Sequence, residues 1–313
     1  MQGSILGPLL FLIMTNDLQC YVSSSCKLVS YADDTQLVHS GLPTDSGLED
    51  LRTIIESDLK MAAAWYKTNG LKINPTKTEF LVVGTPAQTR KSASLTVKFE
   101  DSILSSSDNI KILGITIDKN LTWHHQTGKV VKKCFSALVT INKLRHVLPT
   151  QTVKTLIQTL AFSHLMYCLP AWAPTTDIER KRLNKAINFA VRTVTGKRKM
   201  ERISQARLDL GWMDFTEMIN YRDCVRMHNM VHRRDGSTTL RKLVKARHDI
   251  STRITRESAD PTIMQASDTR PLHLETVRKM FPHRALQTWK ALPANIRKEK
   301  SLEKFKHDFK LPN

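Results

Sequence analysis

The spacing of apolar residues changes once along this chain, near residue 125, and that change limits the folds open to it. Before residue 125, short apolar runs alternate with turn residues, a pattern typical of strands mixed with helices. After it, apolar residues recur every three to four positions, as they do along amphipathic helices. The sequence therefore predicts an α+β first part, residues 1–125, and a mainly α-helical second part, residues 126–313.

Two helices are predicted in the first part. One begins at Gly7-Pro8, with proline in its first turn, and extends over Leu9–Leu18. The other begins with the capping-box pattern Ser46-x-x-Glu49 and ends at Asn69-Gly70. Because its apolar residues share one face, we expect the second helix to be core scaffold without a chemical role.

Strands are predicted between and after these helices. Residues Cys26–His39 alternate on both sides of Asp33-Asp34, which predicts a β-hairpin with the two aspartates at its turn. The near-continuous apolar run Glu79–Gly84 is expected to be a strand buried on both faces. Two further strands are predicted at Leu95–Phe99 and Ile110–Ile117.

The second part is predicted to contain four amphipathic helices. They lie near residues 130–144, 150–169, 177–195 and 214–233. Residues 246–271 combine Ser, Thr, Asp and Pro with weak periodicity, so we expect a loop or a poorly ordered segment there. A short basic helical tail is expected after it.

Positive charge is concentrated in the second part. Residues 1–125 hold 11 Lys and Arg against 13 Asp and Glu, a net charge of −2, whereas residues 126–313 hold 37 against 16, a net charge of +21. Such an excess favours a polyanionic partner, and nucleic acid is the first candidate. Basic residues beside apolar helix faces are the predicted backbone contacts: Lys129, Lys132, Lys133, Arg180, Arg182 and Lys185. The alternatives are intramolecular ion pairs or a merely solvated face.

Cysteine usage and apolar stretches bear on the compartment. The five cysteines are scattered, without a CxxC pair or a Cys/His cluster of zinc-finger spacing, so the reducing interior of a cell, nucleus or cytoplasm, is expected. The stretch Ile5–Met14 resembles the core of a signal peptide, but no Lys or Arg precedes it and Pro8 interrupts it, so secretion is not expected. No stretch reaches the uninterrupted apolar length of a membrane span.

The motif with the most chemical content is Tyr31-Ala32-Asp33-Asp34. Two adjacent carboxylates at a tight turn cannot both point into a core, so at least one faces solvent or a cation. Hard divalent ions such as Mg²⁺ take carboxylate oxygens, and two such ions hold both oxygens of an in-line phosphoryl displacement. The alternative is that Asp-Asp is simply favourable turn chemistry.

Other blocks accompany this motif in order. Gln2-Gly3-Ser4-x-Leu6-Gly7-Pro8 and Asn16-Asp17-Leu18 precede it, and Asn74-Pro75-x-Lys77-Thr78-Glu79 and Leu113-Gly114-Ile115-x-Ile117-Asp118 follow it. In this order they resemble the palm of reverse transcriptases from LINE-type, non-LTR retrotransposons, in particular the Jockey-like group of animals. Residues 164–176, 210–215 and 284–310 resemble the later helical regions of the same family, so the resemblance covers essentially the whole chain.

The resemblance implies a role for each matching residue. Asp33 and Asp34 would be the catalytic carboxylates and the metal ligands, with Asp33 as the principal ligand and Mg²⁺ as the cofactor. The residues implied near the nucleotide and template are Gln2, Gly3, Tyr31 and Lys77. The residues implied in the hairpin that grips the primer are Leu113 and Gly114. The implied partners are an RNA template, a DNA primer and deoxynucleoside triphosphates, without a membrane, and the oligomeric state stays open.

One departure from the family pattern matters most. Family members begin the first block with Pro, where this chain has Met1, and the strand with the family's first catalytic aspartate lies upstream of that block. The resemblance therefore implies a partial polymerase palm at residues 1–125, an antiparallel sheet with packed helices that lacks the fingers and the first catalytic strand. Residues 126–313 would be a basic, thumb-like and C-terminal helical region.

A truncated palm has consequences for activity. The family's metal site uses three carboxylates, and Asp17 matches a different family position, so only Asp33 and Asp34 remain. We therefore expect a fragment of an RNA-directed DNA polymerase that is inactive by itself, binds Mg²⁺ weakly and exposes part of its sheet edge. The alternative is a non-catalytic nucleic-acid-binding remnant that uses the basic half.

Overall fold

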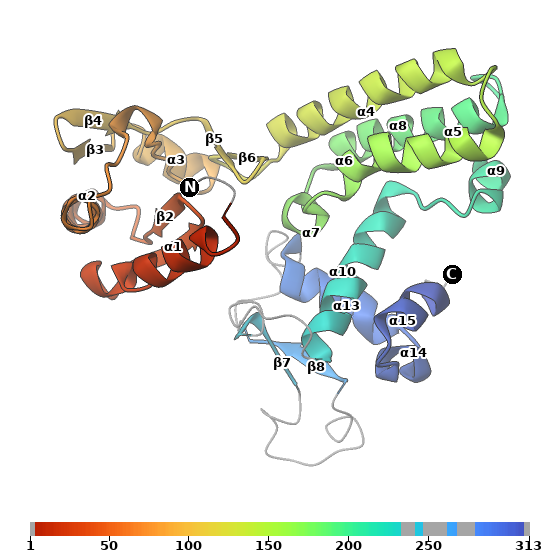
Figure 1. Cartoon of the computed structure of the whole chain (residues 1–313). Helices are drawn as coiled ribbons and strands as arrows, with labels where there is room; N and C mark the ends of the chain where they lie inside the picture. The colour runs from red at the N-terminus through yellow and green to blue at the C-terminus, as the bar shows by residue number, and fades with distance from the viewer. Residues whose placement is uncertain (1–3, 233–241, 247–261, 268–278, 310–313) are drawn as a thin grey trace. The chain divides into compact units, whose positions relative to one another are not determined.

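The structure, a computed structural model, describes residues 4–232, 242–246, 262–267 and 279–309 (Figure 1). The chain divides into two compact units, Met1–Leu121 and Thr122–Asn313, close to the change of apolar spacing at residue 125. The first unit mixes helices with strands, and the second is mainly helical, so the coarse fold class predicted from the sequence is confirmed. Within the described ranges, no helix has both the length and the hydropathy needed to cross a bilayer.

The described part of the first unit consists of helices and two-stranded hairpins. The helices are α1 (Gly7–Thr15), α2 (Asp45–Thr68) and α3 (Pro86–Lys91), with 3₁₀ turns at Leu18–Tyr21 and Pro75–Lys77. The antiparallel hairpins are β1 (Lys27–Tyr31) with β2 (Asp34–Val38), β3 (Thr96–Phe99) with β4 (Ser102–Ser105), and β5 (Asn109–Ile112) with β6 (Ile115–Asp118). In the described residues these pairs remain separate two-stranded sheets, so the single antiparallel sheet expected for the palm is not formed.

Helix α2 supplies the core of the first unit, as its apolar stripe predicted. Ala62 and Trp65 are buried in one cluster with Leu18 from the first 3₁₀ turn. Strand β3 also packs against α2 and buries Val97 and Phe99. Leu28 and Leu37 of the β1–β2 hairpin pack against the first cluster, so the helix joins two hairpins that lie far apart in the sequence (Figure 1).

The beginning of α2 differs from the prediction, whereas its end agrees. The predicted capping box at Ser46 is wrong, because the N-cap is Thr44, whose hydroxyl accepts a hydrogen bond from the Gly47 N–H at 3.2 Å. Thr44 has the extended backbone that an N-cap requires, and Ser46 already lies in the first turn. At the other end, Asn69 is the C-cap and Gly70 has a φ of 72°, a left-handed conformation that glycine adopts without steric cost.

The run Glu79–Gly84 is not a strand, which corrects the prediction of a doubly buried one. Only Phe80 forms a bridge, a parallel one to Ser106, and the Ser107 N–H donates to the Phe80 carbonyl at 2.8 Å. The residues of this run are half-buried or exposed. A strand buried on both faces needs layers on each side, and the described residues provide none here.

The run Ile110–Ile117 is two strands rather than one. Ile112 pairs with Ile115, so Leu113 and Gly114 form a two-residue turn between β5 and β6. Both turn residues have positive φ, 46° and 84°. Two-residue hairpin loops favour such left-handed conformations, and Gly114 is the sequence signal for the turn.

The second unit is built from helices with one short strand pair in its described part. Its elements are α4 (His124–Leu144), α5 (Thr150–Leu156), a π-helical stretch (Ile157–Phe162), α6 (Ser163–Met166), α7 (Leu169–Trp172), α8 (Asp177–Thr195), α9 (Ser204–Asp209), α10 (Phe215–Val231), β7 (Val244–Ala246), β8 (Met264–Ala266), α13 (Phe281–Ala291), α14 (Ala294–Lys298) and α15 (Leu302–Asp308). The predicted helices at 177–195 and 214–233 are therefore confirmed. The helix predicted at 150–169 ends at Met166 and contains the π-helical stretch.

The predicted loop 246–271 lies largely outside the described residues. Its described ends carry an antiparallel pair, in which Ala246 of β7 lies opposite Met264 of β8. The basic tail predicted at the end of the chain is helical in α13, α14 and α15.

Two helical clusters form the core of the second unit. In the first, α4 packs along α8 and against the π-helical stretch, and Cys134 and Leu138 of α4 are buried, as are Leu183 and Ile187 of α8. In the second, α10 packs against α13 and α15 and buries large side chains that include Trp289.

A buried ion pair joins the second cluster to α7. Asp223 on α10 is fully buried, and Arg284 on α13 donates to its two carboxylate oxygens at 2.6 and 3.0 Å. The same guanidinium donates to the carbonyls of Lys279 and Pro170 at 2.7 and 3.1 Å. Burial raises the pKa of Asp223 above its ordinary range even though Arg284 lowers it, so this carboxylate depends strongly on its partner.

We expect Arg284→Leu to destabilise the second unit by about 3–5 kcal/mol, because it leaves the Asp223 carboxylate buried without its cation. The double variant Asp223→Leu with Arg284→Leu should recover much of that loss, since no charge is then left buried. Thermal unfolding of the two variants checks this. Equal stability of the single and double variants would show that the unpaired Asp223 carboxylate is not the cause of the loss.

Helix α1 presents apolar residues to the outside within the first unit. None of its residues is buried, and Leu10 and Ile13 are 61% and 65% exposed. We therefore expect the double variant Leu10→Glu with Ile13→Glu to change the free energy of unfolding by only about 0.5 kcal/mol and to reduce self-association. Thermal unfolding and light scattering measure the two effects. The matched change Leu18→Glu, at a fully buried position, should instead unfold the first unit.

Candidate functional site

The acidic motif lies at the turn of the β1–β2 hairpin. The strands pair from Lys27 with Val38 to Tyr31 with Asp34, which leaves Ala32 and Asp33 as a two-residue loop. The predicted turn Asp33-Asp34 is therefore displaced by one residue, and Asp34 is the first residue of β2. Ala32 has a φ of 51°, which is uncommon for a residue with a Cβ atom and is tolerated because so short a loop requires it.

The hairpin holds both aspartates in water. Asp33 and Asp34 are exposed, and Tyr31 beside them is 65% exposed. A two-residue loop projects beyond the strands, so its side chains have no core to enter. Exposed carboxylate oxygens of this kind can bind a hydrated divalent cation.

Two carboxylates are an incomplete set for a tight metal site. In the part of the chain that the structure describes, no third His, Cys, Asp or Glu side chain joins Asp33 and Asp34 as a metal-binding group. Their oxygens fit Mg²⁺ by type, but most of its coordination would come from water or from a bound phosphate.

The other predicted residues of this site are distributed over the first unit. Lys77 is exposed at the end of the 3₁₀ turn Pro75–Lys77, which the Asn74 side chain caps by accepting from the Thr76 N–H at 3.0 Å. Leu113 and Gly114 form the β5–β6 turn. Gln2 and Gly3 lie outside the described residues. Within the described part, no hydrogen bond or ion pair joins the side chains of Asp33, Asp34 and Lys77 to one another.

The hairpin β3–β4 offers an internal comparison. Phe99 pairs with Ser102, so Glu100 and Asp101 form another exposed two-residue acidic turn, and Glu100 has a φ of 50°. Its geometry matches that of the Ala32-Asp33 turn. Turn geometry alone therefore does not distinguish a polymerase motif from ordinary turn chemistry, and the surrounding sequence has to do so.

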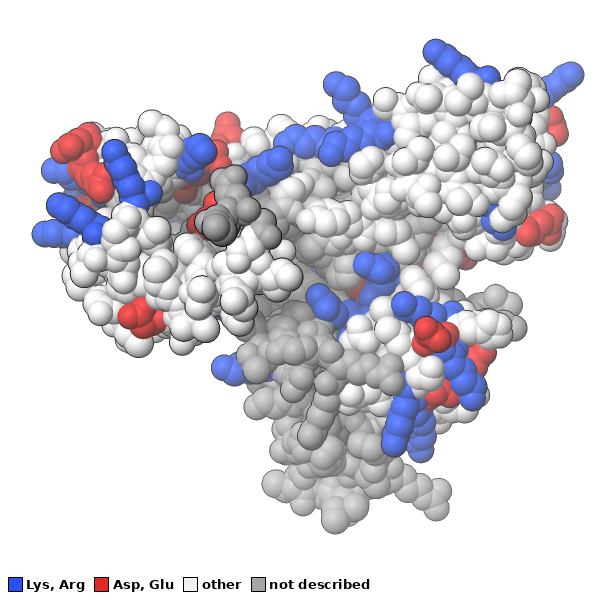
Figure 2. Space-filling model, in the orientation of Figure 1, with Lys and Arg blue, Asp and Glu red and all other residues white. Residues whose placement is uncertain are grey.

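A second candidate surface lies on α4 in the second unit. Lys129, Lys132 and Lys133 are exposed on this helix, spaced so that they share one side of it. Figure 2 shows Lys and Arg side chains gathered along α4. Such a row suits phosphates, which bind cations without regard to sequence.

The predicted basic residues on α8 differ from one another. Lys185 is exposed, whereas Arg182 is paired with the buried Glu179, to which its Nη1 donates at 3.0 and 2.9 Å. Arg180 is half-buried, and its Nε makes no hydrogen bond to the described residues. The alternative of intramolecular ion pairs therefore applies to Arg182, and Lys185 is better placed for an external anion.

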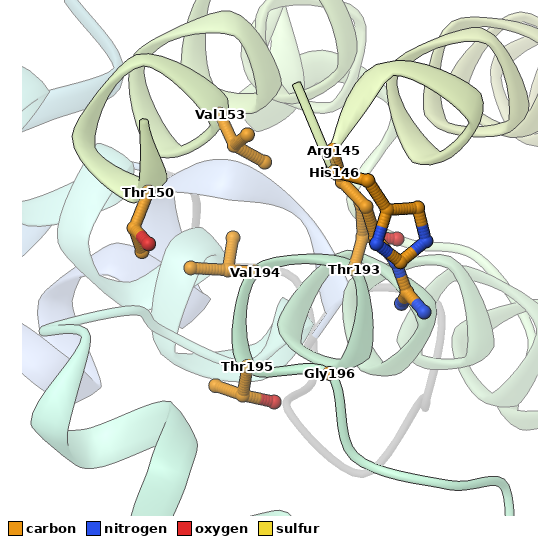
Figure 3. A pocket seen from close by; sticks show the side chains of 8 residues that line it. All are labelled: Arg145, His146, Thr150, Val153, Thr193, Val194, Thr195 and Gly196. Atoms are coloured by element: carbon orange, nitrogen blue, oxygen red, sulfur yellow. The ribbon is translucent and has the colours of Figure 1, made fainter. Parts of the chain in front are cut away.

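Sequence reasoning missed a small cavity where α4 and α8 end (Figure 3). It has a volume of about 230 Å³. Its lining includes Arg145, whose Nε donates to His146 Nε2 at 3.2 Å, together with Thr150 and Val194. This volume is below the range of about 300–1,000 Å³ of small-molecule sites, so it suggests no organic ligand. The residues come together from three separate segments, and no local pattern could have indicated them.

Comparison with known proteins finds one family match and one similar curated protein. Residues 1–117 match the family model of the reverse transcriptases (RNA-dependent DNA polymerases). The chain is also similar to the "Probable RNA-directed DNA polymerase from transposon BS" of Drosophila melanogaster, with 27% identity over 249 residues. That similarity covers 74% of this chain and 26% of the relative, so the chain spans about a quarter of the length of the curated protein it matches. No solved structure matches the chain.

The two comparisons and the motif order point to the same assignment. The matched segment contains the hairpin with Asp33 and Asp34, the Lys77 turn and the Leu113-Gly114 turn. The similarity to the transposon protein spans more residues than that segment has. Residues 1–117 thus match the reverse transcriptase family, and the similarity of the chain to a transposon RNA-directed DNA polymerase extends beyond that segment.

Proposed function

We propose that Asp33 and Asp34 are the metal-binding catalytic carboxylates of the polymerase from which this fragment comes. The observation that carries the proposal is the exposed Asp33-Asp34 pair at the β1–β2 turn, set among the ordered sequence blocks and inside the segment that matches the reverse transcriptase family. Asp33 is the principal ligand, and Asp34 assists from the first position of β2. When bound, Mg²⁺ would neutralise charge on the phosphates of an in-line nucleotidyl transfer.

The remaining residues have supporting roles in this proposal. The resemblance assigns Tyr31, at the end of β1, to the primer terminus, and Gln2 and Gly3 to nucleotide and template binding. Lys77 is an exposed compact cation, suited to the charge on a departing pyrophosphate. The two-residue β5–β6 turn at Leu113 and Gly114 is assigned to the support of the primer strand.

The proposed substrates are those of the family. They are an RNA template, a DNA primer and deoxynucleoside triphosphates, and Mg²⁺ is the proposed cofactor. The name of the Drosophila relative includes RNA-directed DNA polymerase, and its similarity supports these substrates. In the proposal, the first unit is a partial palm, and the second is a thumb-like and C-terminal region.

These 313 residues by themselves are proposed to have little or no polymerase activity. Only two of the three carboxylates that the family's chemistry uses are brought together in the described residues. Without a third protein ligand or a bound triphosphate, Mg²⁺ binding is dominated by water and is weak.

A second activity of the fragment is proposed for the basic helices, namely nucleic-acid binding without sequence preference. The exposed lysines of α4 and Lys185 of α8 support it, together with the net charge of +21 over residues 126–313. Phosphate contacts of this kind give strong salt dependence and no base recognition.

We expect the chain to bind Mn²⁺, used as a paramagnetic stand-in for Mg²⁺, weakly and at the β1–β2 turn. Signal broadening in nuclear magnetic resonance spectra should centre on Asp33 and disappear in the variant Asp33→Asn with Asp34→Asn. The matched control, Glu100→Gln with Asp101→Asn, removes the acidic turn of β3–β4 and should leave the broadening at Asp33 unchanged. Equal broadening at both acidic turns would favour ordinary turn chemistry.

A primer-extension assay of the same chain should show no extension above background. Extension that is lost in Asp33→Ala and kept in Asp101→Ala would contradict the proposed inactivity while supporting the catalytic assignment. Extension that survives Asp33→Ala would argue against that assignment itself.

We expect the chain to bind RNA and mixed-sequence duplex DNA similarly, and the triple variant Lys132→Ala, Lys133→Ala, Lys185→Ala to weaken both to the same degree. The log–log dependence of affinity on salt should lose a slope of about 3, one for each lost phosphate contact. Filter binding at several salt concentrations measures both the affinity and its salt slope.

A matched triple variant in the first unit, Lys27→Ala, Lys98→Ala, Lys111→Ala, removes the same charge from exposed positions. It should leave the salt slope unchanged. Equal losses in the two triple variants would show that net charge, rather than the α4 and α8 surface, determines binding.

A further inference from the structure

A second group of potential metal ligands lies in the first unit, away from the exposed acidic turn. Cys26 precedes β1, His39 follows β2, and Asp58 is on α2. The sulfur of Cys26, a ring nitrogen of His39 and a carboxylate oxygen of Asp58 all lie within 4.8 Å of one another. The linear spacing of these residues does not indicate a site, because the three come from separate elements.

The fold itself brings these three side chains together. Lys27 pairs with Val38 in the β1–β2 ladder, so the next pair outward places Cys26 opposite His39. The third residue, Asp58, is on the buried side of α2, the helix that forms the core of the unit. The site is thus at the open end of the hairpin, opposite the turn that carries Asp33.

These residues are buried, unlike most acidic clusters on protein surfaces. Cys26 is 5% exposed, and the side chains of His39 and Asp58 are each 5% exposed. His39 Nε2 lies 2.7 Å from Asp58 Oδ2. With the sulfur of Cys26 close to both of these atoms, small shifts of the three side chains would let them surround a small cation.

The Asp58 carboxylate is held in place from its other side. Its Oδ1 accepts from the Ser23 N–H at 2.7 Å, and its Oδ2 accepts from the Ser23 hydroxyl at 2.6 Å. Metal-binding carboxylates are commonly fixed by such additional hydrogen bonds. Burial works to raise the pKa of Asp58, but the hydrogen bonds from Ser23 and His39 outweigh it and lower the pKa below its ordinary value.

We propose that Cys26, His39 and Asp58 bind a Zn²⁺ ion. The set of one thiolate, one imidazole and one carboxylate is a Zn²⁺ ligand set, with bond lengths of about 2.3 Å for sulfur and about 2.0–2.2 Å for nitrogen and oxygen. The tetrahedral fourth position is left for water or for the Ser23 hydroxyl. A thiolate and an imidazole are poor ligands for Mg²⁺, so this site and the Asp33-Asp34 turn select different ions.

Binding changes the protonation of the group. Burial, and next the Asp58 carboxylate, raise the pKa of the Cys26 thiol, while a hydrogen bond from the Val38 backbone lowers it. The thiol is therefore protonated at neutral pH, and Zn²⁺ takes the place of that proton as the sulfur becomes a thiolate. The His39 imidazole binds through Nε2 and carries its proton on Nδ1.

The proposed ion has a structural role. It would join both strands of the β1–β2 hairpin to α2, in addition to the hydrogen bonds between Asp58 and Ser23. The alternative is an ordinary buried His39–Asp58 pair with Cys26 packed as an apolar side chain. The geometry of the three side chains carries this proposal, independently of the polymerase function proposed above.

Titration of the full chain with Co²⁺ under reducing conditions tests the proposal, because Co²⁺–thiolate complexes absorb in the near ultraviolet. One equivalent of Co²⁺ should produce this absorption, and Zn²⁺ should abolish it by displacement. The Cys26→Ser variant should lack the absorption, and Cys20→Ser, which changes an exposed cysteine nearby, should keep it. Absence of the absorption in the unmodified chain, or its persistence in Cys26→Ser, would overturn the proposal.

Thermal unfolding keeps the proposal testable if Cys26→Ser does not fold. A ligand that binds only the folded state raises the melting temperature. Zn²⁺ should therefore raise the melting temperature of the unmodified chain and of Cys20→Ser, and Mg²⁺ should not. The isosteric Asp58→Asn variant should lose the rise. If Zn²⁺ does not raise the melting temperature of the unmodified chain, His39 and Asp58 form an ordinary buried pair and the proposal is wrong.

Discussion

A buried carboxylate has to receive hydrogen bonds from the protein, because burial removes it from water, and both units of this chain are organised around that constraint. In the first unit, Asp58 on α2 accepts from Ser23 and pairs with His39. In the second, Asp223 on α10 accepts from Arg284. Each aspartate collects its partners from segments distant in sequence, so each determines where a neighbouring element is placed.

The two buried aspartates satisfy this constraint with different partners. Asp223 accepts hydrogen bonds from the Arg284 guanidinium, which also donates to the Lys279 and Pro170 carbonyls. This ion pair therefore keeps helices together. Asp58 lies beside a thiol and an imidazole, so the same kind of fixed carboxylate becomes part of a ligand set. Chemistry therefore depends less on the buried charge itself than on the side chains that surround it.

The exposed acidic turn differs from the buried aspartates, because water rather than the protein solvates its carboxylates. Asp33 lies outside the core because a two-residue loop projects beyond its strands, and Asp34 is exposed beside it as the first residue of β2. The Glu100-Asp101 turn has the same geometry in the same unit. Both turns lie inside residues 1–117, which match the reverse transcriptase family, so the ordered set of sequence blocks around Tyr31–Asp34 is what separates them.

Much of the secondary structure could be predicted locally. The hairpin over Cys26–His39, the helix at 177–195 and the end of the α2 helix at Asn69-Gly70 agree with alternation, helical spacing and a glycine stop signal. The failures have physical causes. Ser46 and Thr44 are both capable caps, and only the backbone conformation selects Thr44. The apolar run at 79–84 predicts a strand, but a strand needs neighbours that the local sequence does not contain.

The sequence by itself determined the division of charge, the position of the acidic motif at a hairpin turn and the match of residues 1–117 to the reverse transcriptases, because these depend on residue identities and short-range spacing. Only the tertiary structure decided which charged groups are available. It buried Glu179 of α8 against His124 of α4 and left Lys185 exposed, and it brought Cys26, His39 and Asp58 together. Such contacts depend on how α2 and α8 pack against distant segments, and packing is set by the whole fold rather than by any stretch of residues.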